Sequence, residues 1–138
     1  MQLDQLPPAR VIAGLADLLF ALPGVQEQPS AISVPGARAL WLEPNDARGP
    51  REAFLVGREF AHLHPAPEGS LHAALPPPWA AEAIEQGWAE IHPIARLGLI
   101  PGNVVMLYAP RDEGEVAVVL ELVRAALAFA RGELRGDL

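Results

Sequence analysis

At 138 residues the chain has the length of one ordinary domain, and we predict a single domain over residues 1–138. The net charge is −7 and the basic residues are scattered arginines, so we expect no nucleic-acid partner, and the absence of cysteine and lysine excludes thiolate and Schiff-base chemistry. No signal-peptide pattern occurs, and no apolar run approaches the roughly 20 residues of a membrane span, so we expect a cytoplasmic protein without membrane contact.

The first third of the chain predicts one helix and two short strands. In residues 6–22 apolar side chains recur at helical spacing after two prolines, and a Pro-Gly pair ends the helix. Residues 31–34 and 38–42 are expected to be strands on either side of a second Pro-Gly turn. Residues 44–50 are rich in polar and helix-breaking residues and predict a loop.

The middle of the chain has the pattern of a β-hairpin. Residues 53–56 and 59–64 predict strand on either side of a glycine. Residues 65–69 form a proline- and glycine-containing connection, and residues 70–75 return as a strand in which apolar side chains alternate. We therefore expect the two strands around this connection to pair.

The last part predicts helix, strand and helix. Three consecutive prolines precede a helix over residues 79–86, and residues 88–92 are short and extended. Residues 103–109 form an apolar strand, and residues 112–115 match a capping box at the start of a final amphipathic helix. This order predicts an α+β fold in which an antiparallel sheet carries about three helices, packed mainly on one face.

All four histidines fall within thirty-one positions, and three of them fall on the predicted hairpin. Because alternate residues of a strand share a face, Phe60, His62 and His64 are expected to project the same way. A simple five-residue loop would then place His62 opposite His72 and His64 opposite Ser70, which brings three imidazoles together.

The same alternation places further polar residues. Trp88, Glu90 and His92 are expected to point one way, and they would complete the cluster if their segment borders the hairpin. Glu59 is expected on the face opposite to that of the histidines, paired with an arginine such as Arg58 or Arg51. A cluster of this kind can bind a divalent metal, can act as acid and base without metal, or can be a set of polar residues on a solvated face. We assign no metal to it.

Four stretches carry a resemblance to a known family: residues 57–64, 69–76, 87–93 and 105–112. In order and spacing they resemble the luciferase-like domain family, a group of mostly uncharacterised bacterial and fungal proteins that includes relatives of the fungal luciferase. The resemblance covers roughly residues 51–131. It implies an α+β domain with the shared motifs around one pocket. In the fungal enzyme the reaction looks like the oxygenation of a pyrone luciferin without an organic cofactor.

The residues and the resemblance together define the candidate site. The candidate catalytic residues, which the resemblance carries over as motif positions, are His62, His64, Glu90 and His92. The candidate ligand-binding residues are Arg58, His72, Trp88 and Tyr108.

Three functional hypotheses follow. The first is a small-molecule-binding domain with a His/Glu pocket, acting as a cofactor-free oxygenase or lyase on an aromatic or enolic ligand. One histidine would take the proton of the enol, and Arg58 or a second histidine would steady the oxyanion. The second hypothesis is a non-catalytic structural or protein-interaction module, for which a homodimer is one form. The third is a histidine-ligated metalloprotein. Imidazoles more than about 8 Å apart could not share one small ligand or one ion, and such a separation would favour the second hypothesis.

Overall fold

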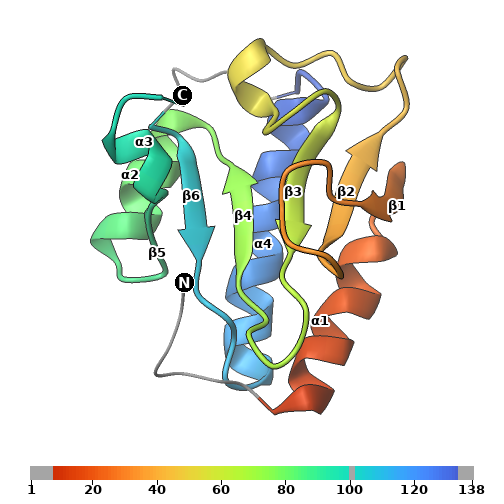
Figure 1. Ribbon diagram of the computed structural model, residues 1–138, viewed down its shortest axis with the longest axis vertical. Helices are drawn as coiled ribbons and strands as arrows, with labels where there is room; N and C mark the ends of the chain where they lie inside the picture. Colours follow the sequence, from red (N-terminus) through yellow and green to blue (C-terminus); the bar gives the residue numbers. More distant parts are fainter. Residues whose placement is uncertain (1–7, 100–101, 134–138) are drawn as a thin grey trace.

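The computed structural model describes residues 8–99 and 102–133, and their strands form one antiparallel sheet (Figure 1). The strand order across the sheet is β1-β2-β3-β4-β6-β5, and every neighbouring pair is antiparallel. The strands are β1 (Val25–Pro29), β2 (Arg38–Leu42), β3 (Glu59–Leu63), β4 (Leu71–Ala74), β5 (Ala89–Ile91) and β6 (Val104–Leu107).

The long helices cover one face of this sheet. The helices are α1 (Ala9–Phe20), the 3-10 turn η1 (Arg51–Ala53), α2 (Pro77–Glu85), the single-turn α3 (Pro93–Arg96) and α4 (Glu113–Ala130). In Figure 1, α1 and α4 lie side by side behind the sheet, while α2 lies beside β5 at its edge. This arrangement confirms the predicted α+β fold with helices mainly on one face, although the sequence pattern did not predict α3. No helix within the described ranges is both long and apolar enough to cross a membrane.

The core lies between α1, α4 and the sheet. Leu15 and Leu19 of α1, Phe129 of α4 and Phe60 of β3 are completely buried there. The apolar stripes of the two helices, which recur at helical spacing, are therefore the faces that meet the sheet. Within the described residues no long helix covers the opposite face of the sheet, and this is the face on which the histidines lie.

Two strand predictions are wrong. Residues 31–34 form bends instead of a strand, and the first strand is β1, whose register pairs Glu27 with Leu40. β1 is an exposed edge strand made largely of Gln and Glu, so it lacks the alternation that identifies a half-buried strand. Residues 53–56 contain the end of η1 and only an isolated bridge at Val56, because this segment turns tightly into β3 instead of extending alongside it.

The predicted hairpin is confirmed in register. His62 pairs with His72 and Leu63 pairs with Leu71, and the amide of His64 donates to the carbonyl of Ser70 at 2.8 Å. The connection ends at a glycine with φ of 71°, a conformation that other residues rarely adopt. A local turn thus connects the two paired strands that bring the histidines together.

The capping box before α4 is confirmed in part. Asp112 is the N-cap, and its Oδ1 accepts a hydrogen bond from the amide of Glu115 at 2.9 Å. The carboxylate of Glu115 accepts from the amide of Arg111 instead of reaching the N-cap amide. The pattern therefore located the start of the helix, while the reciprocal bond is displaced by one residue.

One glycine in the predicted loop has no room for a side chain. A Cβ on Gly49 would lie 2.1 Å from the carbonyl oxygen of Phe129, because the Gly49 amide donates to the Ala130 carbonyl at 2.8 Å and holds the loop against the end of α4. We expect Gly49→Ala to lower the free energy of unfolding by at least about 2 kcal/mol through overpacking.

The control for this substitution is Gly14→Ala. Gly14 lies in α1, and a methyl group added there would meet no other atom within 4 Å, so alanine should raise stability by about 0.5–1 kcal/mol through its better helix propensity. Urea denaturation measures both variants. Equal effects of the two substitutions would contradict the close approach of the loop and α4.

Candidate functional site

A β-bulge in β3 determines which side chains reach the histidine face. The pairing with β2 passes from Ala61 directly to Glu59, which leaves Phe60 as an extra residue. Such an extra residue interrupts the alternation of the strand. Phe60 therefore packs into the core beside Ala61, and Glu59 turns to the face of His62. The predictions that Phe60 shares the histidine face and that Glu59 lies opposite to it are both wrong for this reason.

Glu59 is a completely buried carboxylate with three hydrogen-bond donors around it. It accepts from Oγ of Ser30 at 2.8 Å, from the amide of Ala31 at 3.0 Å and from Nδ1 of His62 at 2.9 Å. Burying a charge without such partners would cost several kcal/mol, so these donors are what permits it there. Since a carboxylate only accepts, Nδ1 of His62 is assigned the proton and Nε2 keeps a lone pair.

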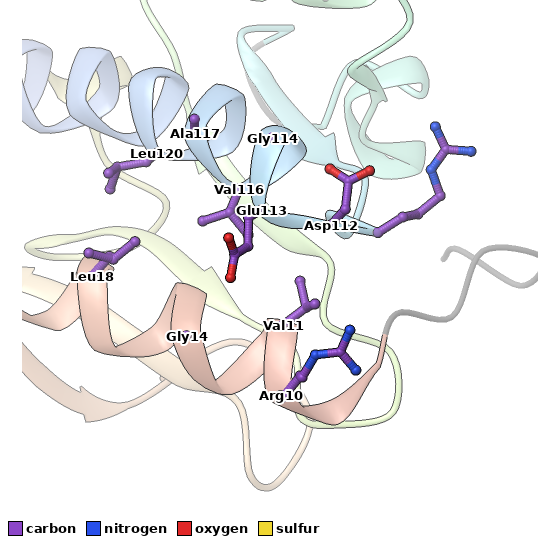
Figure 2. Close-up of a pocket in the computed structure, with 11 residues that line it drawn as sticks. Arg10, Val11, Gly14, Leu18, Asp112, Glu113, Gly114, Val116, Ala117 and Leu120 are labelled. Atoms are coloured by element: carbon purple, nitrogen blue, oxygen red, sulfur yellow. The ribbon is translucent and has the colours of Figure 1, made fainter.

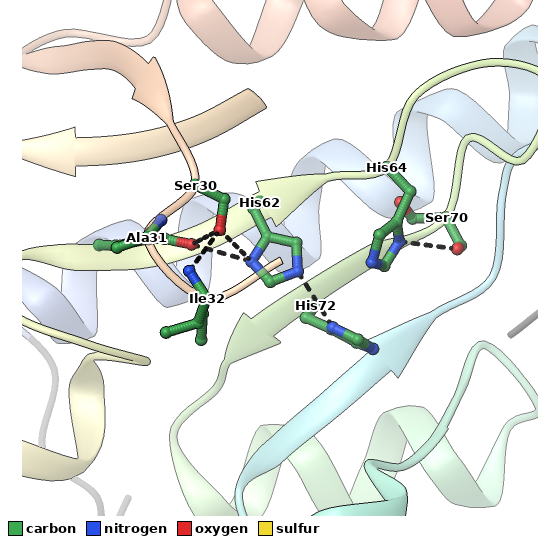
Figure 3. A network of polar contacts seen from close by, with 8 residues as sticks. Ser30, Ala31, Ile32, His62, His64, Ser70 and His72 are labelled. Atoms are coloured by element: carbon green, nitrogen blue, oxygen red, sulfur yellow. Dashed lines mark hydrogen bonds and ion pairs between the residues drawn. The ribbon is translucent and has the colours of Figure 1, made fainter. Parts of the chain in front are cut away.

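The hydrogen bonding continues from His62 to His72. Nε2 of His62 lies 3.1 Å from Nδ1 of His72, and because Nε2 carries the lone pair, His72 is the donor. A hydrogen-bond chain therefore runs from Glu59 through His62 to His72. Figure 3 shows the link between His62 and His72. His62 is buried, whereas His72 is only partly buried, so the chain ends where solvent or a ligand can reach.

His64 has its own orienting partner. Its Nδ1 lies 2.9 Å from the carbonyl oxygen of Ser70, which can only accept, so Nδ1 carries the proton and Nε2 is left with a lone pair. The hydroxyl of Ser70 lies 3.0 Å from the same nitrogen. The hairpin turn that pairs these two residues thus also sets the orientation of the ring.

The four imidazoles form one group, which we call the histidine cluster: His62, His64, His72 and His92. The ring centroids of His62, His64 and His72 lie 4.6–5.0 Å apart, and that of His92 lies 4.4 Å from His72. These spacings are well inside the roughly 8 Å beyond which the rings could not share one small ligand.

Burial makes most of this cluster neutral. Desolvation, followed by electrostatic repulsion from the neighbouring His62, lowers the pKa of His64 and of His92 below the usual histidine range. The same causes, with further contributions from the neighbouring histidines, lower the pKa of His72 to about 2. These three rings therefore present neutral nitrogens at physiological pH.

The structure places Glu90 and Tyr108 near the cluster but not in it. Across the sheet, His72 pairs with Met106 and Met106 pairs with Glu90, so the methionine stands between the histidine and the carboxylate. The hydroxyl of Tyr108 donates to Glu90 at 3.3 Å. The backbone amide of His92 donates to the carbonyl of Val104 at 3.3 Å, which aligns the end of β5 with β6.

Trp88 and Arg58 lie away from the cluster. Trp88 is half-buried and packs against the hydrophobic core. The guanidinium of Arg58 donates to the carbonyl of Leu42 at 2.6 Å and lies 5.8 Å from the ring of Trp41. Neither residue lines the cavity over the histidines.

That cavity is a groove of about 440 Å³, which we call the histidine groove. Its floor contains the histidine cluster and Met106, and its wall is formed by the segment between β1 and β2. In this segment Ile32 and Val34 expose about half of their surface, at 54% and 53%. The groove is lined by Ile32, Ser33, Val34, His62, His64, Glu68, His72, His92 and Met106.

Sequence reasoning missed the wall and the buried carboxylate. Ser30 and Ala31 donate to Glu59, and in this way they anchor the 30–34 segment over the sheet. One signal for Glu59 was available: Phe60 and Ala61 are adjacent apolar residues, and both can enter the core only if the strand bulges between them.

A larger hollow of about 940 Å³ lies on the helical side of the sheet, between α1 and the start of α4 (Figure 2). Arg10, Asp112 and Glu113 line it together with aliphatic residues such as Val11 and Leu18. Asp112 is already engaged as the cap of α4. The hollow contains none of the histidines, so the histidine groove is the stronger candidate for chemistry.

Comparisons with known proteins place the histidines in a shared region. The chain is 35% identical to the luciferase of Armillaria gallica over 82 residues, which are 57% of this chain and 30% of that protein. It is 36% identical to the luciferase of Neonothopanus nambi over 84 residues, 59% of this chain and 31% of that protein. The chain therefore matches about a third of the length of these relatives, and no solved structure matches it significantly. The family model described as the luciferase domain matches residues 57–126, half of the chain with every histidine in it, and the chain belongs to this family.

Proposed function

We propose that the histidine groove binds a small aromatic or enolic molecule with an acidic hydroxyl, and that the chain is an oxygenase or lyase that acts on it without an organic cofactor. The observation that supports this most is the hydrogen-bond chain from Glu59 through His62 to His72, which ends in the groove. A buried carboxylate that orients a histidine is an arrangement that enzymes use to hold a reactive imidazole.

The two sides of the groove suit the two parts of such a molecule. Ile32 and Val34 offer apolar surface to a planar ring, while the imidazole nitrogens with lone pairs accept the hydrogen of its hydroxyl. A hydroxyl that donates to an imidazole gains electron density on its oxygen, which prepares an enol for attack by an electrophile such as dioxygen. The imidazole that takes this proton becomes an imidazolium and steadies the negative oxygen, whereas Arg58 is held by the carbonyl of Leu42 and does not line the groove.

The relatives support the oxygenase form of the proposal. The two fungal proteins carry the name luciferase, and the luciferase-domain model matches a stretch of this chain that contains the histidine cluster. Because this chain spans only about a third of each relative, the substrate of the fungal proteins is not carried over, and only the class of enolic ligand is proposed.

A pair of matched ligands tests the proposal. 4-Hydroxycoumarin has an enolic hydroxyl on a flat ring system, and coumarin has the same rings without the hydroxyl. We expect 4-hydroxycoumarin to bind with a Kd below about 1 mM and coumarin to bind at least roughly tenfold weaker, because the imidazoles lose their hydrogen-bond donor. Calorimetric titration in the presence of EDTA measures both, and an oxygen electrode tests consumption of dioxygen.

Two variants locate the binding. Ile32→Ser removes apolar surface from the groove wall and should weaken 4-hydroxycoumarin binding several-fold. Leu97→Ser is the matched control, because Leu97 is 72% exposed and does not line the groove. If neither coumarin binds, or if both variants bind 4-hydroxycoumarin as the unmodified chain does, the ligand does not occupy this groove.

A further inference from the structure

Three imidazoles of the histidine cluster present nitrogens to one small space. His62 and His64 project from and just beyond β3, and His72 projects from β4, on the same side of the sheet (Figure 3). One nitrogen from each of the three rings can be chosen so that all three lie within 4.8 Å of one another. We infer that His62, His64 and His72 bind one divalent first-row transition-metal ion.

The hydrogen bonds behind the rings are those that metal-bound histidines need. A histidine ligand usually donates its other ring N–H to a carboxylate or to a backbone carbonyl, which fixes the tautomer and the orientation of the ring. Here Nδ1 of His62 donates to the buried carboxylate of Glu59, and Nδ1 of His64 donates to the carbonyl of Ser70. Both rings consequently have their lone pair on Nε2, on the side away from these acceptors, and the lone pair of His62 accepts from His72 when no ion is bound.

The nitrogen spacing is close to that of a coordinated set. Two nitrogens bound at 2.0–2.1 Å to a tetrahedral ion lie about 3.3 Å apart, and they can never be more than about 4.2 Å apart. Nε2 of His62 and Nδ1 of His72 are 3.1 Å apart, and one nitrogen from each of the three rings can be chosen so that no separation exceeds 4.8 Å. Binding through Nδ1 of His72 requires this ring to carry its proton on Nε2 instead, so the ion replaces the hydrogen bond between the two rings. Closing the set around a tetrahedral ion shortens the widest separation by at most about 1.5 Å, which is less than about 1 Å for each ring if both rings move.

The donors also select the class of ion. Three imidazoles suit Zn²⁺, Cu²⁺, Ni²⁺ and Fe²⁺, whereas Mg²⁺ and Ca²⁺ prefer oxygen ligands. A site with three protein ligands leaves a coordination position for water or for an oxygen of a bound molecule. The buried carboxylate of Glu59 behind His62 supplies one negative charge that partly offsets the charge of the ion.

The test uses the ion alone, with protein that carries no histidine tag and has been stripped with EDTA. Titration with Co²⁺, followed by visible absorption, and with Zn²⁺, followed by calorimetry, should show one ion per chain, while Mg²⁺ at the same concentrations should not bind. Removing one ligand with His64→Gln should weaken Co²⁺ and Zn²⁺ binding by at least about tenfold. If the unmodified chain binds well below one ion per chain, the inference is wrong.

The matched control is His92→Gln, which removes the one imidazole of the cluster that lies outside the three-histidine group. Its affinity for Zn²⁺ should be that of the unmodified chain, and an equal loss in the His64 and His92 variants would overturn the assignment. Far-UV circular dichroism checks that each variant folds, and His72→Gln replaces His64→Gln if the latter does not fold. Zn²⁺ should also raise the Tm of the unmodified chain, since the fold brings the three imidazoles together and the folded state should therefore bind the ion more tightly than the unfolded state.

The outcome for the ion is independent of the outcome for the organic ligand. The coumarin titration is done in EDTA and the metal titration without coumarin, so either result can fail while the other holds. If both hold, a titration of 4-hydroxycoumarin in the presence of Zn²⁺ tests whether the ion and the hydroxyl of the ligand contact each other in the groove.

Discussion

Replacing Glu59 by alanine is expected to lower the free energy of unfolding by about 3–5 kcal/mol, because three hydrogen-bond donors lose the acceptor they share, at about 1–3 kcal/mol for each donor left unsatisfied. The substitution removes the acceptor of Oγ of Ser30, of the amide of Ala31 and of Nδ1 of His62, and of these three residues His62 is buried and Ser30 partly buried. Glu59→Gln keeps one acceptor oxygen, so its loss should be smaller. Urea denaturation with an unchanged m value measures both.

The matched control is a carboxylate of the same kind on the surface. Glu27 pairs with Arg38 at 2.6 Å, but both side chains are more than 40% exposed, so Glu27→Ala should cost no more than about 1 kcal/mol. Nitrogen-15 NMR of the imidazoles also reports which ring nitrogen carries the proton. His62 should be protonated at Nδ1 in the unmodified chain and should lose this preference in Glu59→Ala. Equal stability losses for Glu27→Ala and Glu59→Ala would show that the buried carboxylate does not hold the cluster together.

The fold could be predicted wherever the local pattern and the tertiary environment agreed. The stripes of α1 and α4, the hairpin between His64 and Ser70, and the apolar strand β6 all follow from periodicity and turn residues. β1 could not be found in this way, because an edge strand with both faces near solvent needs no alternation, and only its pairing with β2 defines it.

The pairing of the histidines could be predicted from the sequence, but the positions of Glu59 and of the groove wall could not. Strand parity correctly paired His62 with His72, because no bulge lies between them and the turn. The same rule failed three residues earlier at Glu59, where the alternation is interrupted by the extra residue. The groove wall depends on hydrogen bonds between residues about 30 positions apart in the chain, which no local pattern encodes.

The second large prediction follows from the β-bulge at Phe60 in β3. If β3 were regular, Phe60 would face the histidine groove, and its truncation would change ligand binding more than stability. In the structure Phe60 is completely buried in the core, so Phe60→Ala should lower the free energy of unfolding by about 3–5 kcal/mol through loss of packing. Binding of 4-hydroxycoumarin and of Zn²⁺, measured at a temperature at which the variant is folded, should change little.

Phe20→Ala serves as the matched control, because Phe20 lies at the end of α1 and is only partly buried against the same core, so its truncation should cost less than that of Phe60. The extra residue is what lets two adjacent apolar side chains enter the core while the glutamate before them turns to the other face. Core packing and the buried carboxylate are therefore two results of one local irregularity. A Phe60→Ala variant that kept its stability but lost ligand binding would mean that β3 is regular and that Glu59 reaches His62 in some other way.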